Sequence, residues 1–142
     1  CKTMKFIRHF LTLLVCALVS GCGHIEVTPE GDPNRVLAGT VNLRIPADLP
    51  GDASMVVRVV DNARSEVALR VLGEQVVARA GNAPVPFRVE FQASDATLRH
   101  GLNVEARISS GGKLRYYNIN ANGLTLGNLD LPYYIVVDPV GR

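Results

Sequence analysis

The chain has 142 residues and carries 15 lysine and arginine residues against 13 aspartate and glutamate residues, a formal net charge of +2. Its length suits one domain with a hydrophobic core of its own. The near-neutral charge and the three cysteines argue against a strongly basic nucleic-acid-binding protein and against a disulfide-rich scaffold.

Residues 1–21 have the pattern of a signal peptide. Lys2, Lys5 and Arg8 form a basic start, and the ten residues from Phe10 to Val19 carry no charge. This run is long enough for a signal-peptide core and too short to cross a bilayer. Its removal leaves 12 basic against 13 acidic residues, a net charge of −1. We therefore expect no nucleic-acid partner.

The end of this segment resembles the lipobox of bacterial lipoproteins. Ser20 and Gly21 directly precede Cys22, and in such lipoproteins the signal is cut before the cysteine, which is then acylated. The resemblance implies lipidation of Cys22, for example with palmitate, and transfer by the lipoprotein-sorting machinery. The alternative is an ordinary secretory signal with a cysteine near its cleavage site. Cys22 is the one cysteine left after cleavage, so no disulfide and no catalytic or zinc-binding cysteine is available.

The residue after the cysteine bears on localisation. Gly23 stands where enterobacterial lipoproteins carry an aspartate that retains them in the inner membrane. We therefore expect a lipid anchor in the cell outer membrane, facing the periplasm. Residues 22–35 contain two prolines and two glycines and show no hydrophobic period, which predicts a flexible tether reaching ~20 Å.

The remaining residues, 36–142, read as β-strands and turns. Apolar residues alternate at Val41, Leu43 and Ile45, and most regularly from Val85 to Phe91. The run 55–60 is apolar on both faces except at one arginine, as in a central strand. The run 67–80 is less regular, and its glycine at position 73 indicates a bulge or a kink.

The second half continues this pattern. One helical turn is expected over 94–98 with Ser94 or Asp95 as N-cap. A strand follows over 102–108, then a Gly111-Gly112 hairpin, and the last strand covers 133–138. Together these elements predict an all-β, single-domain β-sandwich of about seven strands, with a small open barrel as the competing architecture.

The order of several short motifs resembles a family of small lipoproteins. It includes the YscW-like pilotins, which are type III secretion lipoprotein chaperones, and the broader YbaY-like lipoproteins. The resemblance covers residues 36–138. It rests on Gly39-Thr40-Val41, Leu49-Pro50-x-x-Ala53, the run 56–61, Pro86-Phe87-Arg88-Val89, Val104-Glu105-Ala106-Arg107-Ile108 and Gly112-Lys113-Leu114.

The resemblance implies a pilotin. Such a protein binds the C-terminal tail of a secretin subunit, a ring-forming protein of the outer membrane, and promotes its targeting and assembly there. The bilayer, contacted through acylated Cys22, and the sorting machinery would be its other partners. The alternative is a YbaY-like envelope lipoprotein without a secretin client.

Patterns typical of enzymes and of cofactor sites are missing from the sequence. It has no G-x-S-x-G, H-E-x-x-H or glycine-rich phosphate motif, so we expect neither an enzyme nor a bound cofactor or metal. Asn118, Asn120 and Asn122 are spaced like the first calcium ligands of an EF-hand, but Leu129 occupies the position of the final glutamate. An asparagine-rich turn, with positive φ at Asn122-Gly123, is the expected structure.

The four tyrosines form two adjacent pairs, Tyr116-Tyr117 and Tyr133-Tyr134. Because neighbouring residues of a strand point to opposite faces, each pair should place one ring in the core and one outside. The tyrosines are the candidate partner-binding residues, since tyrosine is common at interfaces. The alternative is cross-strand aromatic pairing that only stabilises the sheet.

Overall fold

The described residues form eight strands and one short helix. A computed structural model of the chain describes residues 32–61, 70–120 and 122–141, so the signal segment and Cys22 lie outside the described residues. The elements are β1 (Arg35–Leu43), β2 (Ser54–Asp61), β3 (Arg70–Val77), β4 (Val85–Phe91), α2 (Asp95–His100), β5 (Leu102–Ser110), β6 (Lys113–Tyr117), β7 (Asn122–Leu124) and β8 (Tyr133–Pro139).

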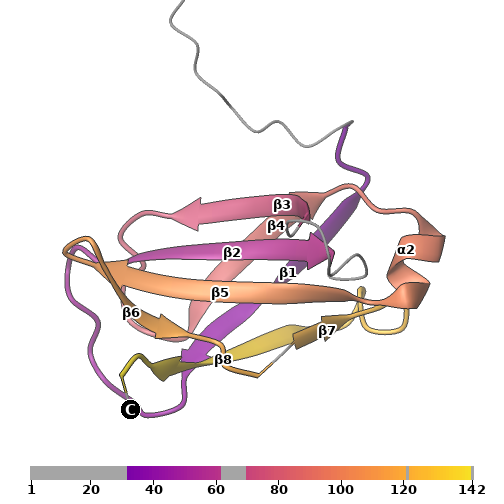
Figure 1. The fold of residues 1–142 in the computed structure, drawn as a ribbon. Coiled ribbons are helices and arrows are strands. Elements are labelled where there is room, and N and C mark those ends of the chain that lie inside the picture. Colours follow the sequence, from indigo (N-terminus) through magenta and orange to yellow (C-terminus); the bar gives the residue numbers. More distant parts are fainter. Residues whose placement is uncertain (1–31, 62–69, 121, 142) are drawn as a thin grey trace, which may run out of the picture.

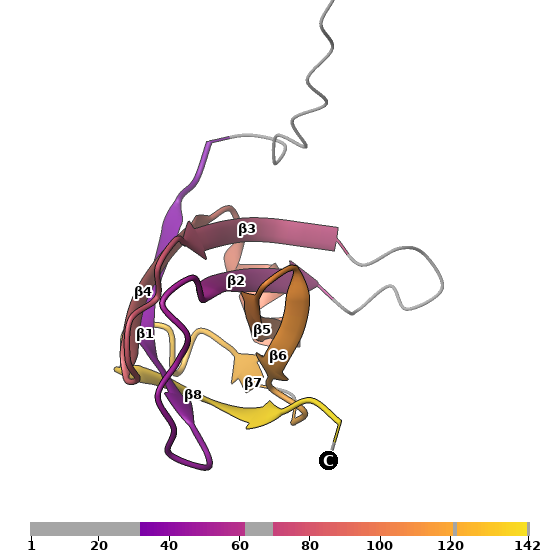
Figure 2. The ribbon, with the colours of Figure 1, turned by 90° about the vertical axis from the view of Figure 1, so that its left-hand side faces the viewer.

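The strands form one sheet in the order β3-β2-β5-β6-β8-β1-β4, with β7 paired to β5. All of these pairs are antiparallel except β1 with β8, which run parallel. The sheet curls so that β1 and β4 lie to one side of the core, β3 above it and β8 below it (Figures 1 and 2). The expected all-β fold is confirmed. The architecture is a nearly closed, barrel-like sandwich, which combines features of the β-sandwich and of the small barrel expected from the sequence.

The sheet closes where its two end strands, β3 and β4, come together. A Cβ atom added to Gly73 would lie 2.4 Å from the carbonyl oxygen of Glu90, so only a glycine allows this approach. The side-chain Oε1 of Gln75 accepts a hydrogen bond from the backbone N–H of Arg88 at 2.6 Å. The register shift expected near Gly73 is present, because Val59 pairs with Gly73 and Val60 with Val71.

The core follows the period-two patterns of the sequence. Val85, Phe87, Val89 and Phe91 are all at most 4% exposed, and β5 buries its alternate residues in the same way. One expectation was wrong. Ile45 was predicted to continue the inward face of β1, but β1 ends at Leu43 and Ile45 is 49% exposed.

The turn between β5 and β6 is fixed by the loop that precedes β2. Gly111 and Gly112 have φ of 59° and 74°, the left-handed conformation that a two-residue hairpin turn needs. Asp52 accepts hydrogen bonds from Ser110 Oγ at 2.6 Å and from Gly111 N–H at 3.0 Å. These two bonds stabilise the carboxylate and lower the pKa of Asp52.

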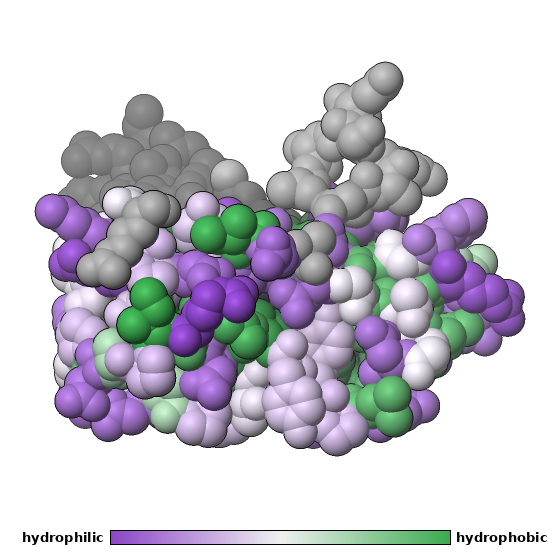
Figure 3. Space-filling model, turned by 90° about the horizontal axis from the view of Figure 1, so that it is seen from below, coloured by the Kyte–Doolittle hydropathy of each residue, from purple (hydrophilic) through white to green (hydrophobic). Residues whose placement is uncertain are grey.

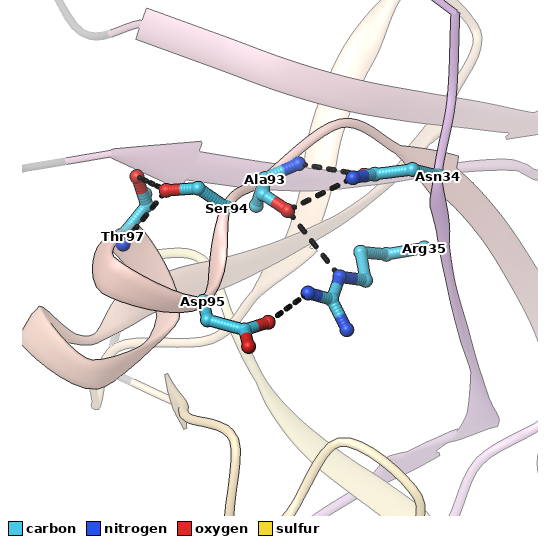
Figure 4. Close-up of polar contacts among 6 residues, drawn as sticks. All are labelled: Asn34, Arg35, Ala93, Ser94, Asp95 and Thr97. Carbon is cyan, nitrogen blue, oxygen red and sulfur yellow. Dashed lines mark hydrogen bonds and ion pairs between the residues drawn. The ribbon is translucent and has the colours of Figure 1, made fainter.

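A polar clamp fixes the chain where β1 begins (Figure 4). The side chain of Asn34 donates to Ala93 O at 3.2 Å and accepts from Ala93 N–H at 3.0 Å. Arg35 donates to the same carbonyl and pairs with Asp95. We name the set Asn34, Arg35, Ala93 and Asp95 the β1 clamp. It fixes the chain to the start of α2 directly before β1.

The clamp is built on the start of α2. Ser94 is the N-cap of this helix, as expected, and its hydroxyl accepts a hydrogen bond from Thr97 N–H at 3.2 Å. The described chain enters the domain beside α2 and β3, whereas β6 and the end of β8 lie at the far end (Figure 1).

Candidate partner-binding surface

The two tyrosine pairs divide between core and surface. Tyr133 is 6% exposed, and Tyr116 is partly buried and packs against the core. Tyr117 and Tyr134 are 36% and 70% exposed. The expected alternation is therefore confirmed. As a consequence, two of the four candidate partner-binding residues, Tyr117 and Tyr134, present their rings to solvent.

The outward tyrosines lie on adjacent strands. Tyr117 of β6 is opposite Asp138 of β8. Tyr134, Val136 and Asp138 are alternate residues of β8. They therefore all point to the outer face of the sheet. Val136 is partly exposed as well. This face of β8 is thus apolar over two successive outward positions.

The connection from β6 to β7 carries a further exposed apolar side chain. It is held near β8 at both ends, by the Tyr117–Asp138 pairing and by a hydrogen bond from Asn122 Nδ2 to Tyr134 O at 3.4 Å. Ile119, within this connection, is 56% exposed. We name Tyr117, Ile119, Tyr134 and Val136 the β6–β8 strip.

Seen from below, the molecule presents the face over β8 (Figure 3). Apolar side chains appear there in separate groups, with strongly hydrophilic side chains between them. A surface of this kind suits a partner that offers both apolar and charged groups. Sequence reasoning found the tyrosines but not Val136 or Ile119. The signal available for Val136 was the run Tyr133 to Val137, which is apolar on both faces.

Asn118, the first asparagine after β6, has a structural role. The Asn118 side chain accepts from Ala106 N–H at 2.9 Å and donates to Val104 O at 2.8 Å, so it takes the place of a strand neighbour for β5. The expected turn at Asn122-Gly123 was wrong. These residues begin β7 and pair with Val104 and Asn103, and Gly123 is not among the glycines with positive φ.

The inward Tyr133 locks β8 to β7. Its hydroxyl donates to Gly123 O at 3.0 Å, and burial raises the pKa of Tyr133 to about 12. Because this pKa is above the value of about 10 in an unfolded chain, the neutral phenol stabilises the fold. That contribution is complete below pH 10 and is lost as the pH rises towards 12.

Replacing Tyr133 should show which part of the alkaline titration of the tyrosines belongs to its hydroxyl. We expect Tyr133→Phe to abolish the component of the ultraviolet phenolate titration centred near pH 12. We also expect it to lower the free energy of unfolding at pH 7 by about 0.5–1.5 kcal/mol. Gly123 O keeps its hydrogen bond from Asn128 Nδ2, which limits the loss. An unchanged alkaline titration in the variant would contradict the assignment.

β4, at one end of the sheet order, lies against β3 and offers no comparable surface. Pro84, directly before β4, and Pro86, within it, are exposed and supply no backbone N–H, and Arg88 N–H is already bonded to Gln75. β4 is therefore not an open edge for an added strand.

Over residues 32–61, 70–120 and 122–141, no group of three or more His, Cys, Asp or Glu side chains is placed to hold a metal ion. Within the same ranges, none of the helices has the length and apolar character needed to span a membrane.

Comparison with known proteins gives two findings. The family model for the type III secretion system lipoprotein chaperone (YscW) matches residues 32–128, more than half of the chain. The fold is similar to the solved structure of an alternative pilotin from the type II secretion system of Vibrio cholerae. The TM-score is 0.67 at 22% identity, over 76% of this chain and 98% of that one. Comparison with curated proteins finds no match.

Proposed function

The chain belongs to the family of type III secretion system lipoprotein chaperones (YscW), and from this membership we propose that it is a secretin pilotin. In this role it binds the C-terminal tail of a secretin subunit and promotes assembly of the secretin ring in the outer membrane. The family match carries the proposal, because residues 32–128 include the whole sheet except β8.

The proposal includes a lipid anchor and no catalysis. Acylation of Cys22 would hold the domain at the periplasmic face of the outer membrane, and several acyl chains make such anchoring effectively permanent. The segment between Cys22 and the β1 clamp, which the sequence predicts to be a tether, would let the domain reach a subunit away from the lipid surface. This role requires only a binding surface of the folded domain, and we propose the β6–β8 strip as that surface.

Deletion of the gene tests the proposal. We expect less assembled, detergent-resistant secretin in the outer membrane, with unchanged synthesis of the subunit. The wild-type gene should restore assembly, whereas a Cys22→Ser variant should remain unlabelled by a fatty-acid probe and restore it poorly.

Two outcomes would contradict parts of the proposal. Normal assembly of both the type III and the type II secretin in the deletion strain would leave a YbaY-like envelope lipoprotein without a secretin client. Equal fatty-acid labelling of the Cys22→Ser variant would remove the anchor but not the binding role.

A further inference from the structure

β3 stands at one end of the sheet order and, among the described strands, pairs only with β2. Ala106 of β5 bonds to Asn118 on the β6 side of that strand. Since bonded pairs alternate along each antiparallel ladder, the backbone groups of Glu74 and Val76 point away from β2. No residue of the described ranges bonds to the N–H or C=O of either. β3 therefore has an open edge at these two residues.

β4 meets β3 through the inward face of β3 and not through this edge. Gly73 lies opposite the buried Val59, so position 73 faces inward, and the carbonyl oxygen of Glu90 approaches it from that side. Gln75, the next inward residue, reaches β4 with its side chain. Val76 points outward and is 59% exposed. The open edge thus lies next to an exposed apolar side chain.

The incoming chain reaches the domain close to this edge. Asn34 N–H donates to Phe91 O at 3.1 Å, and a Cβ atom on Gly73 would lie 3.1 Å from the Cα atom of Phe91. In two views the described chain begins above β3, on the side away from β8 (Figures 1 and 2). Six residues lead from Thr28 to Asn34 and span up to about 20 Å. The residues before Thr28 are therefore within reach of the edge.

Residues 24–28 have the sequence pattern of a short strand. The run His-Ile-Glu-Val-Thr places Ile25 and Val27 on one face and polar side chains on the other. Two prolines and a glycine follow within residues 29–33, which favour a bend between this run and β1. A strand of this length matches residues 73–77, the part of β3 that carries the open edge.

We propose that residues 24–28 add to the open edge of β3 as a further strand, with their two apolar side chains beside Val76. The backbone groups of Glu74 and Val76 then gain hydrogen-bond partners, and the edge is no longer open to other chains. Because the segment belongs to the same chain, its effective concentration at the edge is on the order of millimolar. The docking itself does not rest on the proposed function.

Together with the proposed anchor, docking of this strand orients the domain. Cys22 is two residues before the strand, so its acyl chains are held beside β3. β8 lies on the opposite side of the core (Figures 1 and 2), and the β6–β8 strip then faces away from the lipid. Release of the strand gives the tether its full reach.

Hydrogen exchange of individual amides tests the proposal. The protein is the chain from residue 22 onward with Cys22→Ser, which keeps both the segment and the edge. The test variant adds Ile25→Asp and Val27→Asp, which remove the apolar cover and place like charges beside Glu74. We expect the amides of Glu74 and Val76 to exchange at least about tenfold faster in this variant.

The matched control is the double variant His24→Asp, Thr28→Asp. It adds the same two carboxylates to the same segment and keeps both apolar side chains. Exchange of the two β3 amides should stay as slow as in the chain without these substitutions.

Three outcomes would overturn the proposal. Equal exchange in all of these chains would show that the segment does not cover the edge. Slow exchange that persists in the test variant and depends on protein concentration would mean that β3 pairs with a second copy. Slow exchange that appears only with a peptide of the last few dozen residues of the secretin subunit would assign the edge to that partner. The pilotin role is judged separately, by secretin assembly in the deletion strain.

Discussion

Replacing Phe87 with alanine should lower the free energy of unfolding of the domain by about 3–5 kcal/mol. Phe87 is 4% exposed and packs in the core, between Val85 and Val89 on the inward face of β4. Truncation removes the transfer energy of the ring and leaves a cavity that a closed sheet can fill only in part. Chemical denaturation followed by far-ultraviolet circular dichroism measures the change.

The neighbouring residue provides the control for this measurement. The Arg88 side chain is 59% exposed and its closest acidic contact, with Glu90, is 3.6 Å long. The bond from its backbone N–H to Gln75 does not depend on the side chain. We expect Arg88→Ala to change stability by less than about 0.5 kcal/mol. A loss below about 1 kcal/mol for Phe87→Ala would mean that this face of β4 is not in the core.

Gly39→Ala should destabilise the domain by about 1–3 kcal/mol or more. Gly39 lies opposite Tyr133 in the parallel β1–β8 pair, and a Cβ atom there would stand 2.0 Å from the carbonyl oxygen of Tyr133. Because the obstacle is backbone, no side-chain rotation can relieve the clash. The strands must separate, and the hydrogen bonds on both sides of this position would weaken.

Gly51 offers the matched comparison, since a Cβ atom added there meets nothing within 4 Å. We expect Gly51→Ala to leave the midpoint of thermal unfolding nearly unchanged while Gly39→Ala lowers it by several degrees. Equal midpoints for the two variants would show that β1 and β8 tolerate a wider spacing.

The strands with one buried face could be read from the sequence. In β4 and β5 a period-two alternation of apolar and polar residues specifies which face is inside, and both strands match the expected ranges closely. The sequence also placed the β5–β6 hairpin and the N-cap at Ser94. These are local signals, in which each residue type acts through its own backbone or through its nearest neighbours.

The closure of the sheet and the composition of the candidate site could not be predicted from the sequence, because both depend on contacts between residues that are distant in the chain. Gly73 was expected to interrupt a strand, and its closeness to Glu90 of β4 became clear only from the fold. Asn118 was expected in a turn, whereas its side chain bonds β5. In the same way, the tyrosines were visible in the sequence, but Tyr117 joined the face of β8 only through its pairing with Asp138. Cross-strand register of this kind has no signature in one sequence.

The β1 clamp also decides how the domain responds to mechanical load. A chain that is pulled from its N-terminal side transmits force to Asn34, which is bonded to Ala93 and, through its backbone N–H, to Phe91 O. The force then acts along β1, which holds seven residue pairs with β4 and five with β8. These pairs are loaded together in shear and do not open one after another. A domain attached in this way resists extraction at its point of attachment, while β6, which is not paired with β1, is not loaded directly.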